Sequence, residues 1–200
     1  MKVLIINYGT SNINSIYNSI KKIKKIKIFI NNFNIKKYDK IIFPGQGHIK
    51  TSMNFLKKIH YLSYYLKNSY ILGICIGYHI FFKYSFEDLN INCLNIIKEN
   101  INIISNYCCK KNYTPNVGWN NIEIIKNHKI FKYLKNNFSQ YFMHSYSSIF
   151  NYQNFTYGVS LFNNIKYNSI IINENKFLFQ FHPEKSKMNG LILLNNFINL

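Results

Sequence analysis

The chain contains no arginine and no alanine, and only seven acidic residues face its 25 lysines. The resulting formal net charge of +18 raises the possibility of a nucleic-acid partner. Nucleic-acid sites, however, favour arginine for its planar, bidentate contacts, and its absence argues against that interpretation. The excess of lysine, isoleucine and asparagine runs along the whole length, as a nucleotide bias in the gene would produce. Attraction to an acidic protein partner remains a weaker alternative.

The chain also lacks any apolar run of the roughly 18 residues that cross a bilayer, and its first residues show no signal-peptide pattern. We therefore expect a cytoplasmic protein, and its 200 residues suit one domain spanning 1–200. The four cysteines include no Cys-x-x-Cys pair, so we expect no metal site, no cofactor and no disulfide. They are Cys75, Cys93, Cys108 and Cys109.

Apolar runs and helical spacings alternate over the first half of the chain. Buried strands are predicted at 3–7, 26–30, 38–43 and 70–74, with helices at 13–23, 51–67 and 76–84. Beyond about residue 90, short strands are expected near 96–98, 101–105, 121–125, 139–143, 155–160, 168–172 and 176–181, before a last helix at 187–199. This order predicts an α/β fold, with a mostly parallel central sheet flanked by helices and additional antiparallel strands.

The most informative segment is Gly73-Ile74-Cys75-Ile76-Gly77, which follows a predicted strand and opens a helix. This is the sulfur counterpart of a nucleophile elbow, where a tight turn lifts the attacking atom above the sheet. A helix N-terminus also favours a thiolate. A lone cysteine is more often simply buried, so Cys75 needs partners before it indicates catalysis.

Those partners are predicted at His182-Pro183-Glu184, placed on a second strand where residues two apart share a face. His182 then serves as the base of Cys75, and Glu184 orients the imidazole. The backbone N–H of Ile76 and the strand end Pro44-Gly45-Gln46-Gly47 offer an oxyanion hole, with Gln46 and Gly47 as donors. Because sites of open parallel sheets lie at the carboxyl ends of strands, we expect these segments to converge.

With these residues identified, the chain resembles the class I, triad-type glutamine amidotransferase family. Further segments resemble the glutaminase subunits of imidazole glycerol phosphate synthase: Asn7-Tyr8-Gly9-Thr10-Ser11-Asn12, Pro115-Asn116-Val117-Gly118-Trp119-Asn120, His144-Ser145-Tyr146 and Gln180-Phe181-His182-Pro183-Glu184-Lys185-Ser186. The resemblance implies a flavodoxin-like fold and a thioester mechanism in which Cys75 releases ammonia from glutamine. It also implies a heterodimer with a barrel-shaped cyclase subunit, which uses the ammonia to make imidazole glycerol phosphate and an aminoimidazole carboxamide ribotide in histidine biosynthesis.

The resemblance carries over further roles. It implies substrate binding by Glu87, His79, Ser145 and Tyr146, and a cyclase interface that includes Asn12, Trp119 and Lys185. For Trp119 the alternative is core packing.

This chain also departs from the family. His79 stands where the family usually has a substrate-binding glutamine, and Ser11 replaces a usual glycine. Gln46 replaces a usual valine, and Asn116-Val117 replaces a usual histidine-methionine pair.

Three other functions stay open at this stage. The chain could be a class I glutaminase that serves a different synthase, such as one for pyridoxal phosphate or anthranilate. It could be a degenerate, inactive partner-binding subunit, although the intact triad argues against this. It could also be a non-enzymatic basic protein that binds nucleic acid, which predicts strongly salt-dependent binding to duplex DNA.

Overall fold

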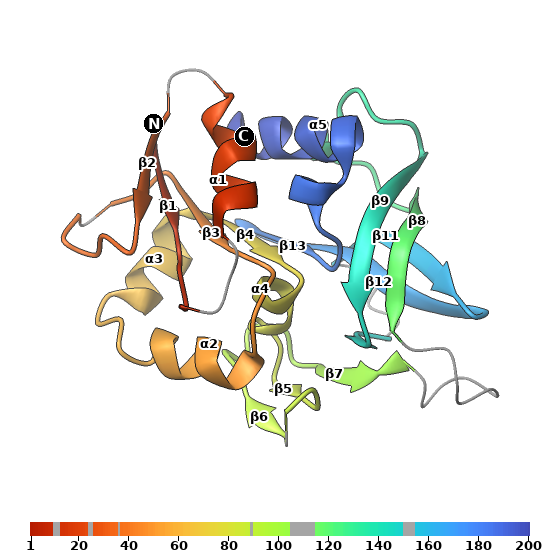
Figure 1. Cartoon of the computed structure of the whole chain (residues 1–200), viewed down its shortest axis with the longest axis horizontal. Helices are drawn as coiled ribbons and strands as arrows, with labels where there is room; N and C mark the ends of the chain where they lie inside the picture. The colour runs from red at the N-terminus through yellow and green to blue at the C-terminus, as the bar shows by residue number, and fades with distance from the viewer. Residues whose placement is uncertain (10–12, 24–25, 36, 89, 105–114, 150–154) are drawn as a thin grey trace.

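The structure, a computed structural model, describes residues 1–9, 13–23, 26–35, 37–88, 90–104, 115–149 and 155–200 (Figure 1). Its main sheet has nine strands in the order β2-β1-β3-β4-β13-β12-β11-β8-β9. The pairs from β2 to β13 are parallel, and those from β13 to β9 are antiparallel. The predicted fold class is therefore confirmed. The strands are β1 (Lys2–Ile5), β2 (Lys27–Ile30), β3 (Lys40–Phe43), β4 (Tyr70–Ile74), β8 (Asn116–Ile124), β9 (Asn137–His144), β11 (Thr156–Phe162), β12 (Ile165–Asn173) and β13 (Lys176–Phe179).

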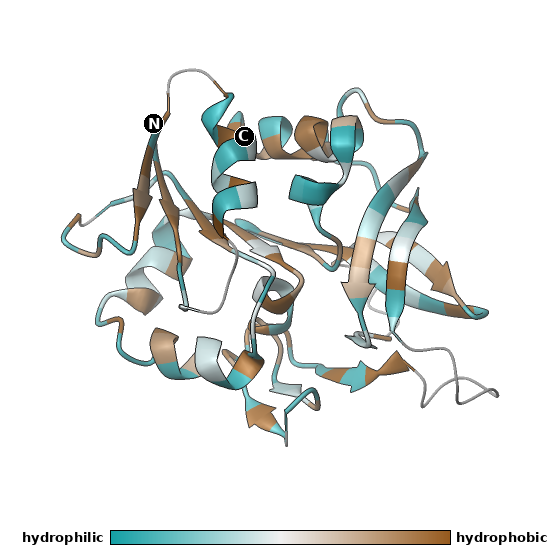
Figure 2. Ribbon diagram, viewed as in Figure 1, coloured by the Kyte–Doolittle hydropathy of each residue, from teal (hydrophilic) through white to brown (hydrophobic). Residues whose placement is uncertain are grey.

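Helices cover both faces of the parallel half of the sheet, and each face has its own hydrophobic core. Helices α1 (Ile13–Lys21) and α5 (Lys187–Ile198) pack on one face, and α2 (Ile49–Leu56), α3 (Leu62–Asn68) and α4 (Ile76–His79) pack on the other. Figure 2 shows the consequence: the central strands are hydrophobic along their length, as expected for strands buried on both sides. In the described part of the chain, no helix is long and apolar enough to cross a membrane.

A second, four-stranded sheet in the order β10-β7-β5-β6 lies beside α4. Its strands are short: β5 (Tyr84–Ser85), β6 (Ile91–Asn92), β7 (Asn100–Ile103) and β10 (Tyr146–Ser147). Two 3₁₀ helices, Lys129–Phe131 and Pro183–Lys185, complete the described elements. The strand predicted near 96–98 is wrong, because those residues form a bend between β6 and β7.

The helices predicted at 51–67 and 76–84 are shorter than expected. The first is split into α2 and α3, because the N–H groups of Lys58 and Ile59 bond three residues back and tighten the end of α2. The second ends at His79, because the carbonyls of Ile80 and Phe82 accept the N–H groups of Leu94 and Asn95 instead of continuing a helix. The end of α4 is therefore set by tertiary hydrogen bonds, which the periodicity of the sequence does not reveal.

Candidate active site

Cys75 lies on the predicted turn between β4 and α4, with φ 48° and ψ −101°. This positive φ is sparsely populated for a residue with a side chain, and such backbone strain clusters at functional sites. Glycine is required beside it, since a Cβ on Gly77 would lie 2.0 Å from the carbonyl oxygen of Phe43. Close packing of α4 against the end of β3 therefore holds the turn. The Cys75 side chain is 5% exposed.

His182 follows β13, the strand that pairs with β4, and it lies directly beside Cys75. A Cβ added to Gly45 would lie 2.8 Å from Cε1 of His182 and 3.0 Å from Cβ of Cys75. The ends of β3, β4 and β13 thus converge at one point, as predicted. A side chain at position 45 would collide with the imidazole and crowd the Cys75 Cβ, which is why glycine stands there.

Glu184 accepts a hydrogen bond from Nδ1 of His182 at 2.8 Å, and both side chains are almost wholly buried. The placement of His182 and Glu184 on a strand was wrong. Glu184 belongs to the 3₁₀ helix Pro183–Lys185, and His182 is the residue before that helix. Burial lowers the pKa of His182, but the charges of Cys75 and Glu184 outweigh it and raise that pKa to about 10. The site therefore favours a protonated His182.

Of the predicted oxyanion donors, Ile76 directly follows Cys75 in the chain. The Ile76 N–H donates to the carbonyl oxygen of Gly45 at 3.4 Å, so this donor is engaged in the structure. Gln46 and Gly47 follow β3, and Gly47 has a φ of 131°, a conformation that favours glycine. The Ile76 N–H can therefore donate to another acceptor only after its bond to Gly45 opens.

A buried polar chain runs from Glu87 to Cys75 through His79 and Gln180. Nδ1 of His79 lies 3.1 Å from Oε2 of Glu87, and Nε2 lies 3.1 Å from Oε1 of Gln180. The Gln180 amide nitrogen is 4.0 Å from the Cys75 sulfur, and Ser147 donates to Gln180 Oε1 at 3.2 Å. Sequence reasoning assigned no role to Gln180. Gln180 stands two residues before His182, and in an extended segment residues two apart point to the same side. This spacing was the signal in the sequence that could have placed Gln180 at the site.

The end of β9 also lies beside Cys75, since the Met143 carbonyl oxygen is 3.8 Å from the sulfur. Ser145 and Tyr146 continue this segment, and both are half-buried. His144 is fixed by the Tyr146 carbonyl at Nδ1 and by the Asn116 amide at Nε2, at 2.9 and 3.2 Å. Burial lowers the pKa of His144 to about 3, so this imidazole is neutral and rigidly held.

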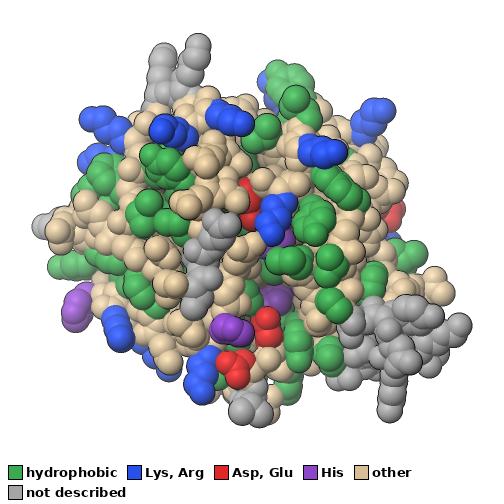
Figure 3. Space-filling model, viewed as in Figure 1, with side chains coloured by type: hydrophobic (Ala, Val, Ile, Leu, Met, Phe, Trp, Pro, Cys, Tyr) green, Lys and Arg blue, Asp and Glu red, His purple; other side chains and the backbone are tan. Residues whose placement is uncertain are grey.

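The three residues predicted at a partner interface have different outcomes. Asn12 lies outside the described residues. Trp119 is 49% exposed, so it does not pack in the core, and its ring meets Tyr141 edge-on at 6.0 Å. The Lys185 ammonium lies 6.0 Å from the Tyr141 ring, and that of Lys187 lies 5.5 Å from the Trp119 ring. Figure 3 shows histidine and acidic side chains near the middle of one face, with exposed hydrophobic side chains and lysines around them.

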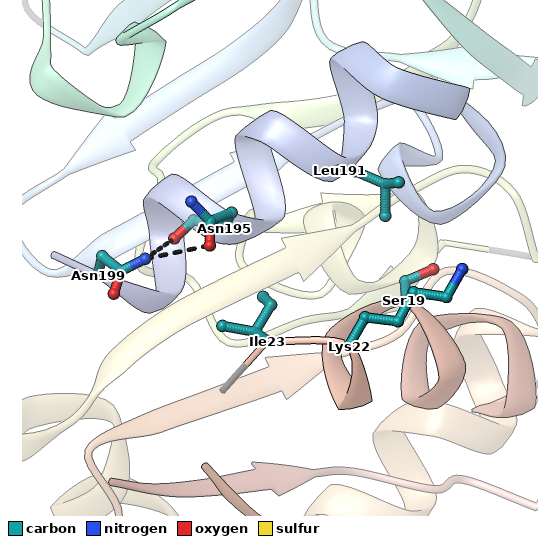
Figure 4. A pocket seen from close by; sticks show the side chains of 6 residues that line it. All are labelled: Ser19, Lys22, Ile23, Leu191, Asn195 and Asn199. Atoms are coloured by element: carbon teal, nitrogen blue, oxygen red, sulfur yellow. Dashed lines mark hydrogen bonds between the residues drawn. The ribbon is translucent and has the colours of Figure 1, made fainter. Parts of the chain in front are cut away.

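A separate hollow of about 450 Å³ lies between α1 and α5 (Figure 4). Its side chains include two asparagines that bond to each other, Asn195 and Asn199, and one lysine, Lys22. None of its lining residues is an acid, a histidine or a cysteine. Among the described residues, no group of three His, Cys, Asp or Glu side chains is arranged to hold a metal ion.

Comparisons with known proteins agree with this geometry. Residues 4–200 match the family described as Glutamine amidotransferase class-I. The imidazole glycerol phosphate synthase subunit HisH of Pelagibacter ubique is 35% identical over the full length of both chains. HisH of Caldanaerobacter subterraneus subsp. tengcongensis is 37% identical, covering 96% of this chain and 95% of that protein.

Solved structures share the fold at much lower sequence identity. PurLQS of Thermotoga maritima has a TM-score of 0.68 and 15% identity, covering 99% of this chain and 97% of that one. A glutamine amidotransferase of Thermotoga maritima has a TM-score of 0.61 and 12% identity, covering 100% of this chain and 83% of that one. These two likenesses show the fold alone, whereas the full-length relatives above 30% identity show the family. The chain belongs to the class-I glutamine amidotransferases and, among them, to the HisH subunits of imidazole glycerol phosphate synthase.

Proposed function

We propose that this chain hydrolyses glutamine to glutamate and ammonia through a thioester on Cys75, and passes the ammonia to a separate cyclase subunit. The observation that carries the proposal is the position of the His182 ring, which bonds to the Glu184 carboxylate through Nδ1 and lies beside Cys75, close enough for Cys75 to raise its pKa. A thiolate, an imidazolium and a carboxylate in that order are the parts that acyl transfer needs.

In the first half of the reaction, the Cys75 thiolate attacks the γ-carboxamide carbon of glutamine. The tetrahedral intermediate then breaks its C–N bond, and His182 gives its proton to the departing nitrogen, which leaves as ammonia. Glu184 keeps the imidazole oriented and stabilises its charge at 2.8 Å. The product is a γ-glutamyl thioester with a neutral His182, which is ready to act as a base.

In the second half, His182 removes a proton from water, which attacks the thioester carbon and releases glutamate. Cys75 leaves as a thiolate, and His182 is again an imidazolium, so the sum is glutamine and water giving glutamate and ammonia. Both tetrahedral intermediates need backbone donors for their oxyanion. We assign this role to Ile76 together with Gln46 or Gly47, once the bond from Ile76 N–H to Gly45 is released.

The substrate's charged end is proposed to lie between Glu87 and the segment of Ser145 and Tyr146. The Glu87 side chain is 29% exposed and offers one oxygen to His79, which leaves the other for an α-ammonium group. Ser145 and Tyr146 follow Met143, whose carbonyl oxygen lies near the Cys75 sulfur. We assign the substrate α-carboxylate to this segment. In this proposal His79 does not contact the substrate as the usual glutamine of the family does; it holds Glu87 in place instead.

The partner is proposed to be the cyclase subunit that makes imidazole glycerol phosphate and the aminoimidazole carboxamide ribotide in histidine biosynthesis. The exposed Trp119 and the neighbouring Lys185 and Lys187 offer aromatic and cationic contacts for such a partner. We further propose that residues 1–200 form a single domain, since the first strand, β1, and the last strand, β13, belong to the same nine-stranded sheet. We place the enzyme in the cytoplasm, where reducing conditions keep Cys75 a free thiol.

The test is glutamate release from glutamine by the chain mixed with the cognate cyclase and its ligand. Cys75→Ala is expected to abolish glutamate release, while added ammonia still supports the cyclase. Glutamate release that persists in Cys75→Ala would reject the nucleophile. Purification of the tagged chain with a different synthase subunit would instead reject the partner and leave the glutaminase assignment intact.

A further inference from the structure

His79 is a buried histidine with an acceptor at each ring nitrogen. Its side chain is 1% exposed. Nδ1 faces the Glu87 carboxylate at 3.1 Å, and Nε2 faces the Gln180 side-chain oxygen at 3.1 Å. A carboxylate oxygen and an amide oxygen can only accept, so each ring nitrogen must donate a proton to make its bond. With these partners, both ring nitrogens of His79 act as donors, and the Glu87 carboxylate lies beside the ring.

The orientation of the Gln180 amide follows from the donors that surround its oxygen. Its oxygen accepts from His79 and from the Ser147 hydroxyl, at 3.1 and 3.2 Å. Its nitrogen therefore points to the other side, where the Cys75 sulfur lies 4.0 Å away. An N–H directed at this sulfur stabilises the thiolate, whereas a carbonyl oxygen in the same place would repel it.

A neutral His79 favours the opposite arrangement. With its one proton directed to Glu87, Nε2 carries a lone pair that repels the Gln180 oxygen. Rotating the amide removes this repulsion, but it then presents the oxygen to Cys75. Two further titratable groups interact with His79: Tyr78, beside it on α4, and the neutral His144 on β9.

We propose that His79 and Gln180 are positioning residues for the nucleophile: the charged imidazole fixes the Gln180 amide so that its N–H stabilises the Cys75 thiolate. The inference rests on the proposed function, because it gives Cys75 the role of nucleophile. It also explains why a buried histidine can replace a substrate-binding glutamine at this position. The histidine holds Glu87 on one side and the amide beside the sulfur on the other.

The test measures the rate of Cys75 alkylation by iodoacetamide across a pH series, without glutamine, and follows the Cys75 peptide by mass spectrometry. Gln180→Glu keeps the shape of the side chain but replaces the N–H that faces the sulfur by a carboxylate oxygen, which carries a negative charge when ionised. His79→Gln keeps one hydrogen bond and removes the charge. His60→Gln is the matched control, since His60 is exposed between α2 and α3. Circular dichroism checks that each variant is folded.

His79→Gln and Gln180→Glu are each expected to alkylate about tenfold more slowly at neutral pH, with a rate curve displaced to higher pH, as loss of one hydrogen bond to a charged group implies. His60→Gln is expected to match the wild type. Folded His79→Gln and Gln180→Glu variants with unchanged pH curves would overturn the proposal. If one variant does not fold, the other decides. Because the readout needs no turnover, a failure here is distinct from a failure of wild-type glutaminase activity, which the glutamate assay reports.

Discussion

Replacing Glu184 by glutamine probes the charge that supports His182. Glutamine retains an oxygen that can accept from Nδ1, so the 2.8 Å hydrogen bond can persist while the negative charge is lost. The other carboxylate oxygen is buried without a hydrogen-bond partner among the described residues, so the new amide group finds no acceptor at its place. The substitution therefore removes charge and adds an unsatisfied donor in a site closed to water.

The size of the effect follows from these contacts. Unit charges about 4 Å apart interact by about 4 kcal/mol at an effective dielectric of about 20. Hydrogen bonds to charged groups contribute about 1.5–3 kcal/mol. Since a neutral hydrogen bond remains, we take a loss of about 2–3 kcal/mol, which corresponds to a fall of about 30- to 150-fold in kcat. The pKa of His182 should also fall from its value of about 10.

The assay is steady-state glutamate release by Glu184→Gln in the presence of the cyclase, together with an NMR titration of His182. A raised pKa stabilises the fold fully below the ordinary value of 6.5, and this contribution is lost as the pH rises toward about 10. The destabilisation by Glu184→Gln should therefore be largest below about pH 6.5 and should shrink toward pH 10. A kcat within threefold of the wild type, with the His182 pKa unchanged, would refute the account of Glu184.

Three further substitutions test other buried groups. Lys40 is 3% exposed with its ammonium 3.9 Å from the Tyr70 ring, and burial, partly offset by Asp39, lowers its pKa to about 8. Lys40→Met should therefore stabilise the protein against urea unfolding by about 1–2 kcal/mol at pH 7. The gain should vanish above about pH 10.5, because Lys40 is then neutral in both the folded and the unfolded wild type. No gain at pH 7 would contradict this. Because the pKa of His144 is lowered to about 3 in the folded protein, this imidazole becomes protonated below about pH 6.5 in the unfolded chain but stays neutral in the folded chain. Between about pH 6 and 3, His144 should lower the unfolding free energy of the wild type by about 1.4 kcal/mol per pH unit. The unfolding free energy of His144→Gln should depend less steeply on pH. Equal slopes would exclude His144 as the cause. Cys75→Gly should be about 1 kcal/mol more stable than Cys75→Ala by thermal unfolding, because glycine adopts the φ of 48° without strain, and the reverse order would argue against strain at the turn.

The parallel half of the fold could be predicted because its signals are local. The apolar run before Cys75 and the glycines around it identified both a strand and the turn that follows, and those features are fixed by sterics within a few residues. The small sheet was missed in part, because two-residue strands such as β5 carry no measurable periodicity. The early end of α4 depends on carbonyl groups captured by a segment some fourteen residues away.

The site divides in the same way. Cys75, His182 and Glu184 could be found because their residue types and order are informative, even though Glu184 lies on a 3₁₀ helix rather than a strand. Gln180 carries no chemical signal of its own, and its importance depends on His79 approaching from another element. The bond between Ile76 and Gly45 is equally tertiary, since it joins the ends of two neighbouring strands.

The most direct test of the central claim is intact-mass analysis of the chain after acid quench of its reaction with glutamine, in the presence of the cyclase and its ligand. The account predicts a covalent adduct with the mass of one glutamyl group, located by peptide mapping on Cys75 and absent from Cys75→Ala. Turnover of glutamine at a normal rate with no adduct on Cys75, or with the adduct on a different residue, would contradict it.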